Sequence, residues 1–137
     1  MIVAIIQARM GSTRLPNKSM LFLKVAPVVE WVWSRVSHAK LLDDVLVAIP
    51  HTSEDDVLGE HLDKLGANVF RGPEHDVLSR FCEALEVHKA DYVVRICADN
   101  PLICGSEIDH LIETSLGKKF DYSYTLSGGE NYLDGLA

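Results

Sequence analysis

The sequence predicts an α/β protein, a three-layer α/β/α sandwich with a mostly parallel, Rossmann-like sheet. Three observations predict this class. Apolar runs rich in valine and isoleucine alternate along the chain with amphipathic helical patterns. The runs are continuous rather than alternating apolar and polar, which is typical of parallel strands that are covered on both faces. The length of 137 residues suits a single domain, residues 1–137, with a sizeable core.

Four apolar runs are the expected strands, and a fifth run is weaker. They are residues 2–6, 45–49, 68–70 and 92–96, with the weaker run at 120–126. Parallel strands joined by helices have right-handed crossovers, and their carboxyl ends lie at one rim of the sheet, where ligands bind. We therefore expect the loops after Ile6, Ile49 and Ile96 to share that rim.

Helical patterns fill the segments between these runs. The expected helices cover residues 27 to about 39, 53–66 and 76–88, with a last one from 106 onward. Pro27 opens the first, because a proline is tolerated in the first turn. The acidic segments 53–56 and 106–109 each resemble a helix N-terminal cap, and Gly66 fits a helix stop.

Composition excludes several classes of protein. The net charge is −7, from 13 basic and 20 acidic residues, which argues against a general affinity for nucleic acid or anionic membranes. No apolar run approaches the ~18 residues of a membrane span, and no basic segment precedes the first run as in a secretory signal. We expect a cytoplasmic protein with free thiols, since Cys82, Cys97 and Cys104 lack metal spacing.

The loop after the first run carries Arg9, Arg14 and Lys18, three cations within ten residues of an acidic chain. A bound polyphosphate is the simplest explanation for this local positive charge. The loop is not a Walker loop, because the second glycine is missing and Pro16 removes a backbone donor. Side chains would therefore bind the phosphate, arginine as a fork and lysine as a point charge. The alternative is a solvated loop whose charges serve solubility.

Residues 7–18, Gln-Ala-Arg-Met-Gly-Ser-Thr-Arg-Leu-Pro-Asn-Lys, closely resemble the signature of the sugar-acid cytidylyltransferases. The nearest branch is that of spore-coat polysaccharide biosynthesis protein F, and relatives include the CMP-Kdo and CMP-neuraminate synthetases. Further similar segments are 43–45, 52–56, 70–72, 76–80 and 99–103. The resemblance implies the nucleotide-diphospho-sugar transferase fold. It also implies transfer of CMP from CTP to a sugar acid, with release of pyrophosphate, in surface polysaccharide biosynthesis.

The resemblance also implies roles for particular residues. Arg9 and Lys18 would be the catalytic pair on the triphosphate, and Asp99 would bind Mg²⁺. The implied nucleotide contacts come from Gln7, Ala8, Arg9, Gly11, Ser12, Arg14, Lys18, Ala48, Arg80 and Cys97. Two alternatives stay open from the residues alone. By its composition, segment 99–101 favours a plain turn, and Arg80 can be a solvated helix residue paired with Asp76 or Glu83.

The chain departs from the family pattern in two places and in length. Relatives commonly carry glycine at the position of Ala98 and glutamine or threonine at that of Cys97. Family members are much longer, and their second half supplies much of the sugar pocket, a second metal-binding aspartate and often a dimerisation arm. We therefore expect the N-terminal part of a longer cytidylyltransferase that could form a homodimer. These 137 residues should bind nucleotide weakly and turn over poorly, and the alternative is a catalytically silent nucleotide-binding or assembly module.

Overall fold

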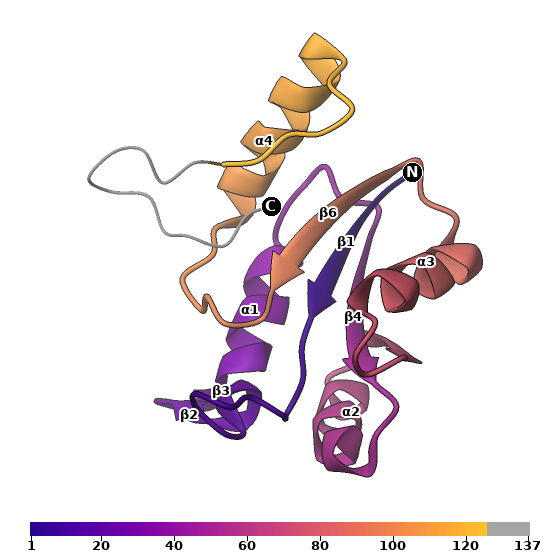
Figure 1. Ribbon diagram of the computed structural model, residues 1–137. Coiled ribbons are helices and arrows are strands. Elements are labelled where there is room, and N and C mark those ends of the chain that lie inside the picture. The colour runs from indigo at the N-terminus through magenta and orange to yellow at the C-terminus, as the bar shows by residue number, and fades with distance from the viewer. Residues whose placement is uncertain (126–137) are drawn as a thin grey trace.

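The computed structural model describes residues 1–125, and four parallel strands form its main sheet. In sequence order these strands are β1 (Ile2–Gln7), β4 (Asp44–Pro50), β5 (Asn68–Gly72) and β6 (Tyr92–Cys97). Their order across the sheet is β5-β4-β1-β6, so β1 lies inside the sheet while β6 forms an edge (Figure 1). The four strong runs are therefore confirmed as parallel strands.

Helices cover both faces of this sheet, three on one face and one on the other. They are α1 (Val28–Val36), α2 (Asp56–Lys64) and α4 (Gly105–Lys118) on the first face and α3 (Val77–His88) on the second (Figure 1). Successive side chains of β1 point to opposite faces. Ala4 and Ile6 pack into the core under the three helices, while Val3 and Ile5 pack against α3. The predicted three-layer sandwich is confirmed.

The register of the sheet aligns the ends of β1 and β6, and β4 runs two residues beyond them. Gln7, the last residue of β1, lies opposite Ala48 of β4 and Cys97 of β6. Hydrogen bonds continue beyond the strand: the Ala8 amide donates to the Ala48 carbonyl (3.2 Å), and the Ala98 amide to the Gln7 carbonyl (3.0 Å). The loops that follow β1, β4 and β6 therefore share one rim, as expected.

A small hairpin between β1 and α1 was not predicted. The antiparallel strands β2 (Phe22–Leu23) and β3 (Ala26–Pro27) form it, with Lys24 in the left-handed region at φ 60°. Strands of two residues are too short to show a period in the sequence. Pro27 belongs to β3 and precedes α1, which ends at Val36, three residues before the expected end.

Neither acidic cap is formed as predicted. Segment 53–56 contains a 3-10 turn (Ser53–Asp55) before α2, and α4 begins at Gly105 after Cys104, each without a side-chain cap. The Asp109 carboxylate instead accepts hydrogen bonds from the amides of Lys40 and Leu41, at 2.9 to 3.0 Å. Such contacts between distant segments leave no local signal. The stop at Gly66 is confirmed, since that residue has φ +76°.

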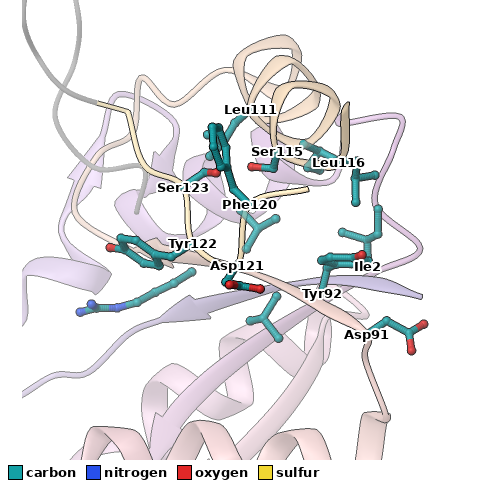
Figure 2. A pocket seen from close by; sticks show the side chains of 14 residues that line it. Ile2, Asp91, Tyr92, Leu111, Ser115, Leu116, Phe120, Asp121, Tyr122 and Ser123 are labelled. Atoms are coloured by element: carbon teal, nitrogen blue, oxygen red, sulfur yellow. The ribbon is translucent and has the colours of Figure 1, made fainter. Parts of the chain in front are cut away.

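The weaker fifth run forms no strand in its described part, residues 120–125, and Leu126 lies outside the described residues. Residues Phe120–Ser123 instead follow the outer edge of β6, where they line a cavity together with side chains of α4 (Figure 2). No helix within residues 1–125 is both long and apolar enough to cross a membrane.

Candidate functional site

The basic loop after β1 is closed on itself by hydrogen bonds. The Met10 carbonyl accepts from the amides of Ser12 (2.8 Å) and Asn17 (3.2 Å), and the Ser19 hydroxyl donates to the Arg9 carbonyl (3.1 Å). Asn17 adopts φ 58°, a left-handed conformation that asparagine tolerates better than most residues. The loop is therefore an ordered turn that returns to its own start before the 3-10 helix Lys18–Met20 (η1).

Lys18 and Asp99 meet across the rim. The Lys18 Nζ atom lies 3.1 Å from Asp99 Oδ2, and both side chains remain accessible to solvent, at 32% and 48%. Lys18 comes from the loop after β1, and Asp99 follows β6, so the shared rim brings together residues 81 positions apart. The sequence predicted that these two loops share a rim, and the structure adds the ion pair between the two side chains.

The segment that holds Asp99 is also a turn. The Asn100 side chain accepts a hydrogen bond from the Leu102 amide (3.1 Å), a geometry that favours a turn at this position. The turn presents one carboxylate to solvent, and residues 1–125 contain no cluster of three or more metal-ligating side chains. One accessible carboxylate fits Mg²⁺ only if phosphate oxygens and water complete its coordination, which is how Mg²⁺ is commonly bound beside nucleotides.

Arg80 is fully buried in the first turns of α3, so a solvated helix residue is the wrong reading. Its Nη1 atom donates to the carbonyl of Pro73 (2.7 Å) and more weakly to that of Glu74 (3.4 Å). Asp76, one of the two possible partners, accepts instead from the amide and hydroxyl of Ser79 and caps α3. Among the described residues, Nε and Nη2 of Arg80 have no hydrogen-bond partner.

Charged groups on the loops after β1 and β4 act on Arg80. Burial lowers the pKa of the Arg80 guanidinium, the negative charge of Asp55 opposes that shift, and the positive charge of Arg9 adds to it. Gly72, at the end of β5, makes room for the side chain. A Cβ atom there would lie 2.8 Å from Arg80 Cγ, which is closer than real contacts allow. A buried cation with two free donors needs an acceptor, and a bound anion or base would supply one.

Asp55 is a site residue that the sequence reasoning missed. It is 2% exposed, and its Oδ1 accepts from the Met10 amide at 2.8 Å. Its Oδ2 accepts from the Thr52 hydroxyl at 2.5 Å. The available signal was the acidic run directly after the buried strand at 45–49, which was read as a local helix cap.

The other predicted nucleotide contacts lie on or near the rim. Arg9, Gly11 and Arg14 are exposed on the loop, Ser12 is half-buried, and Gln7 and Cys97 face each other across β1 and β6. Ala8 and Ala48 are buried and joined through their backbones, and Ala48 lies two residues inside β4, which continues to Pro50. Ala98 does not adopt a positive φ, so alanine in place of glycine causes no backbone strain there.

A cavity of about 340 Å³ lies elsewhere, along the outer edge of β6 (Figure 2). Side chains of Tyr92, Leu116 and Phe120 line it, and none of the predicted site residues does. It lies toward the start of β1 and β6, since Ile2 and Asp91 also line it, whereas the charged residues gather where these strands end. The charge and the free donors therefore favour the rim as the candidate site.

The parallel sheet, the basic loop after its first strand and the aspartate after β6 define a class: an α/β domain of the Rossmann-like nucleotidyltransferase fold. A solved cytidylyltransferase from Leptospira borgpetersenii has the same architecture, with a TM-score of 0.81 and 32% identity over 86% of this chain and 50% of that one. Residues 3–130 match the family described as Cytidylyltransferase, and the chain belongs to that family.

Three proteins from different organisms are similar to this chain in sequence. An uncharacterized protein of Methanocaldococcus jannaschii is 44% identical over 99% of this chain and 54% of its own length. The spore coat polysaccharide biosynthesis protein SpsF of Bacillus subtilis is 36% identical over 92% and 54%. The 3-deoxy-manno-octulosonate cytidylyltransferase 2 of Hydrogenovibrio crunogenus is 30% identical over 89% and 50%. The chain thus spans about half the length of these relatives.

Proposed function

We propose that this chain supplies the nucleotide-binding part of a cytidylyltransferase that transfers CMP from CTP to a sugar acid and releases pyrophosphate. The observation that carries the proposal is the meeting of Lys18 and Asp99 at the rim where β1 and β6 end. Membership of the cytidylyltransferase family supports CTP as the nucleotide substrate. The relative named for 3-deoxy-manno-octulosonate supports a sugar acid as the acceptor. The relative named for spore coat polysaccharide supports a role in surface polysaccharide synthesis.

The proposed reaction is an in-line displacement at phosphorus. A hydroxyl of the sugar acid attacks the α-phosphorus of CTP, the bond to the β-phosphate oxygen breaks, and the hydroxyl proton leaves to solvent or base. Negative charge grows on the equatorial and leaving oxygens, so catalysis depends mainly on positioning and charge neutralisation. Lys18 and Arg9, on the closed loop, would bind the triphosphate and stabilise the departing pyrophosphate. Arg14 lies exposed on the same loop and would add positive charge.

Asp99 would hold Mg²⁺ in this proposal. Its carboxylate is accessible, and phosphate oxygens of CTP would complete the coordination that one aspartate cannot. When bound, the ion would neutralise charge on the phosphate oxygens. In the structure the Asp99 carboxylate is paired with Lys18. This ion pair would separate when the nucleotide binds, and the Lys18 ammonium group would then be free to contact the phosphates.

Arg80 would contact the cytosine in the same proposal. Its two unpaired donor nitrogens, Nε and Nη2, match acceptor atoms of a pyrimidine ring, and their burial makes each unmet donor costly. Because both atoms are buried in the structure, the contact would require a local rearrangement that exposes them to the nucleotide. Gln7, Ala48 and Cys97 lie along the same rim and would line the nucleotide with the loop backbone from Ala8 to Ser12. A cysteine thiol donates only weakly, so Cys97 would add less to base recognition than glutamine or threonine.

Replacing Lys18 by alanine tests the proposed site. We expect the affinity for CTP with magnesium to fall about tenfold, because one charge-assisted contact to phosphate is lost. Titration calorimetry on the wild type and the variant measures the change. Lys64→Ala, which removes an exposed lysine from α2, is the matched control and should bind like the wild type. Equal affinity of Lys18→Ala and wild type would count against the site.

Replacing Asp99 by asparagine tests the metal separately. We expect the affinity for CTP to become nearly independent of magnesium, whereas binding without magnesium should strengthen because Lys18 loses its partner. The same calorimetry, run with magnesium and with a chelator, gives both values. Asp63→Asn, on the exposed side of α2, should keep the magnesium dependence of the wild type. An unchanged magnesium effect in Asp99→Asn would remove Asp99 from the proposal.

The alternative function is a catalytically silent nucleotide-binding or assembly module. It is favoured by Cys97 at the rim, whose thiol is only a weak hydrogen-bond donor. Pyrophosphate release from CTP with a panel of sugar acids separates the two functions. Release that depends on Lys18 supports the transferase, and nucleotide binding without any release supports the silent module.

A further inference from the structure

The Met10 peptide group is the point where the basic loop is tied together. Its carbonyl accepts from the amides of Ser12 and Asn17, so it joins the first half of the loop to the residue before Lys18. Its own side chain is 7% exposed and packs in the main core. Arg9 directly precedes Met10, and Lys18 directly follows Asn17. The orientation of the Met10 peptide group therefore affects the positions of both Arg9 and Lys18.

Asp55 fixes that peptide from outside the loop. It lies after β4, in the 3-10 turn Ser53–Asp55 (η2), and its Oδ1 accepts from the buried Met10 amide at 2.8 Å. The Thr52 hydroxyl donates to Oδ2 at 2.5 Å and holds the carboxylate in place. Both oxygens are therefore engaged, and a side chain that is 2% exposed links the loop after β4 to the loop after β1.

We infer that Asp55 is a positioning residue for nucleotide binding, acting through the Met10 amide to set the basic loop. The inference rests on the proposed function, because it concerns the same site. Asp55 reaches Arg9 and Lys18 only through the loop backbone. It is distinct from Asp99, which faces solvent and pairs with Lys18.

Electrostatics alone would give the opposite behaviour. The negative charge of Asp55 acts on Arg80, as does the positive charge of Arg9, so a carboxylate here lowers the positive potential that attracts an anion. If the charge were all that mattered, any neutral replacement would strengthen nucleotide binding. If the acceptor for Met10 matters, alanine would weaken binding while asparagine would not. Asparagine keeps an oxygen for the Met10 amide, and its NH₂ group can donate to the Thr52 hydroxyl.

The experiment compares Asp55→Ala with Asp55→Asn. For Asp55→Ala we expect CTP affinity with magnesium to fall about tenfold, the loss typical of a hydrogen bond to a charged group. We also expect the Met10 amide proton to exchange with solvent about tenfold faster. Asp55→Asn should match the wild type in both measurements or bind CTP more tightly. Calorimetry gives the affinity and NMR hydrogen exchange the protection of Met10. Asp56→Ala, whose carboxylate pairs with Arg71 at the surface, is the neighbouring control.

Normal affinity in a folded Asp55→Ala variant would overturn the inference, and so would an Asp55→Asn variant as weak as Asp55→Ala. If circular dichroism shows that Asp55→Ala does not fold, Thr52→Val decides instead. It removes the hydroxyl that holds Oδ2, and we expect CTP affinity to fall about threefold, while no change contradicts the inference. If the wild type does not bind CTP, the proposed function fails. The Met10 exchange rates then still show whether Asp55 orders the loop.

Discussion

Replacing Arg80 by methionine should lower the affinity for CTP about 100-fold, since two hydrogen bonds from a buried cation would be lost. Stability should hardly change. The variant loses the bond to the Pro73 carbonyl, but it also removes two unpaired buried donors, each of which costs about 1–3 kcal/mol in the free protein. We expect the free energy of unfolding to stay within about 1 kcal/mol of the wild-type value. Urea denaturation and calorimetry measure the two quantities.

The affinity for pyrophosphate distinguishes the proposed cytosine pocket from the proposed phosphate site. If Arg80 contacts the cytosine, Arg80→Met should bind pyrophosphate like the wild type, whereas Lys18→Ala should bind it more weakly. Arg71→Met removes an exposed arginine from the neighbouring β5 and should leave CTP affinity unchanged. A normal affinity for CTP in Arg80→Met would mean that the two free donors are not used by the nucleotide.

Replacing Gly105 by alanine should destabilise the fold by about 2 kcal/mol, within the range of overpacked sites. Gly105 is the first residue of α4, and a Cβ there would lie 2.8 Å from the Ala39 amide nitrogen and 3.0 Å from the His38 carbonyl carbon. These are backbone atoms after α1, so the two helices would have to separate. Thermal unfolding should show a Tm lower by roughly 6–10 °C.

Gly117 provides the control within the same helix. A Cβ at Gly117 meets no atom within 4 Å, so alanine there should raise the free energy of unfolding by about 0.5–1 kcal/mol through helix propensity alone. If Gly105→Ala were as stable as the wild type, α1 and α4 would not be in the tight contact that the structure shows. The contact also includes Asp109, whose carboxylate accepts from the Lys40 and Leu41 amides.

The sequence by itself determined the class of the fold and the rim on which the site lies. A continuous apolar run such as 45–49, in a chain where such runs alternate with helical patterns, favours a parallel sheet covered on both faces, and the carboxyl ends of parallel strands lie at one rim. That topology predicted that the loops carrying Lys18 and Asp99 share a rim, and the structure adds the ion pair between them. The motif at residues 7–18 pointed to the family without any geometry, because it is a contiguous and specific string of residues.

Only the tertiary structure decided which polar side chains are buried. Arg80 and Asp76 look like a local helix pair in the sequence, yet Arg80 lies inside the protein and Asp76 caps its helix. Asp55 looks like part of a local cap, yet it holds an amide 45 residues away. The physical reason is common to both cases. Local patterns report bonds between near neighbours, whereas a buried polar group is satisfied by whichever backbone or side chain the fold brings to it.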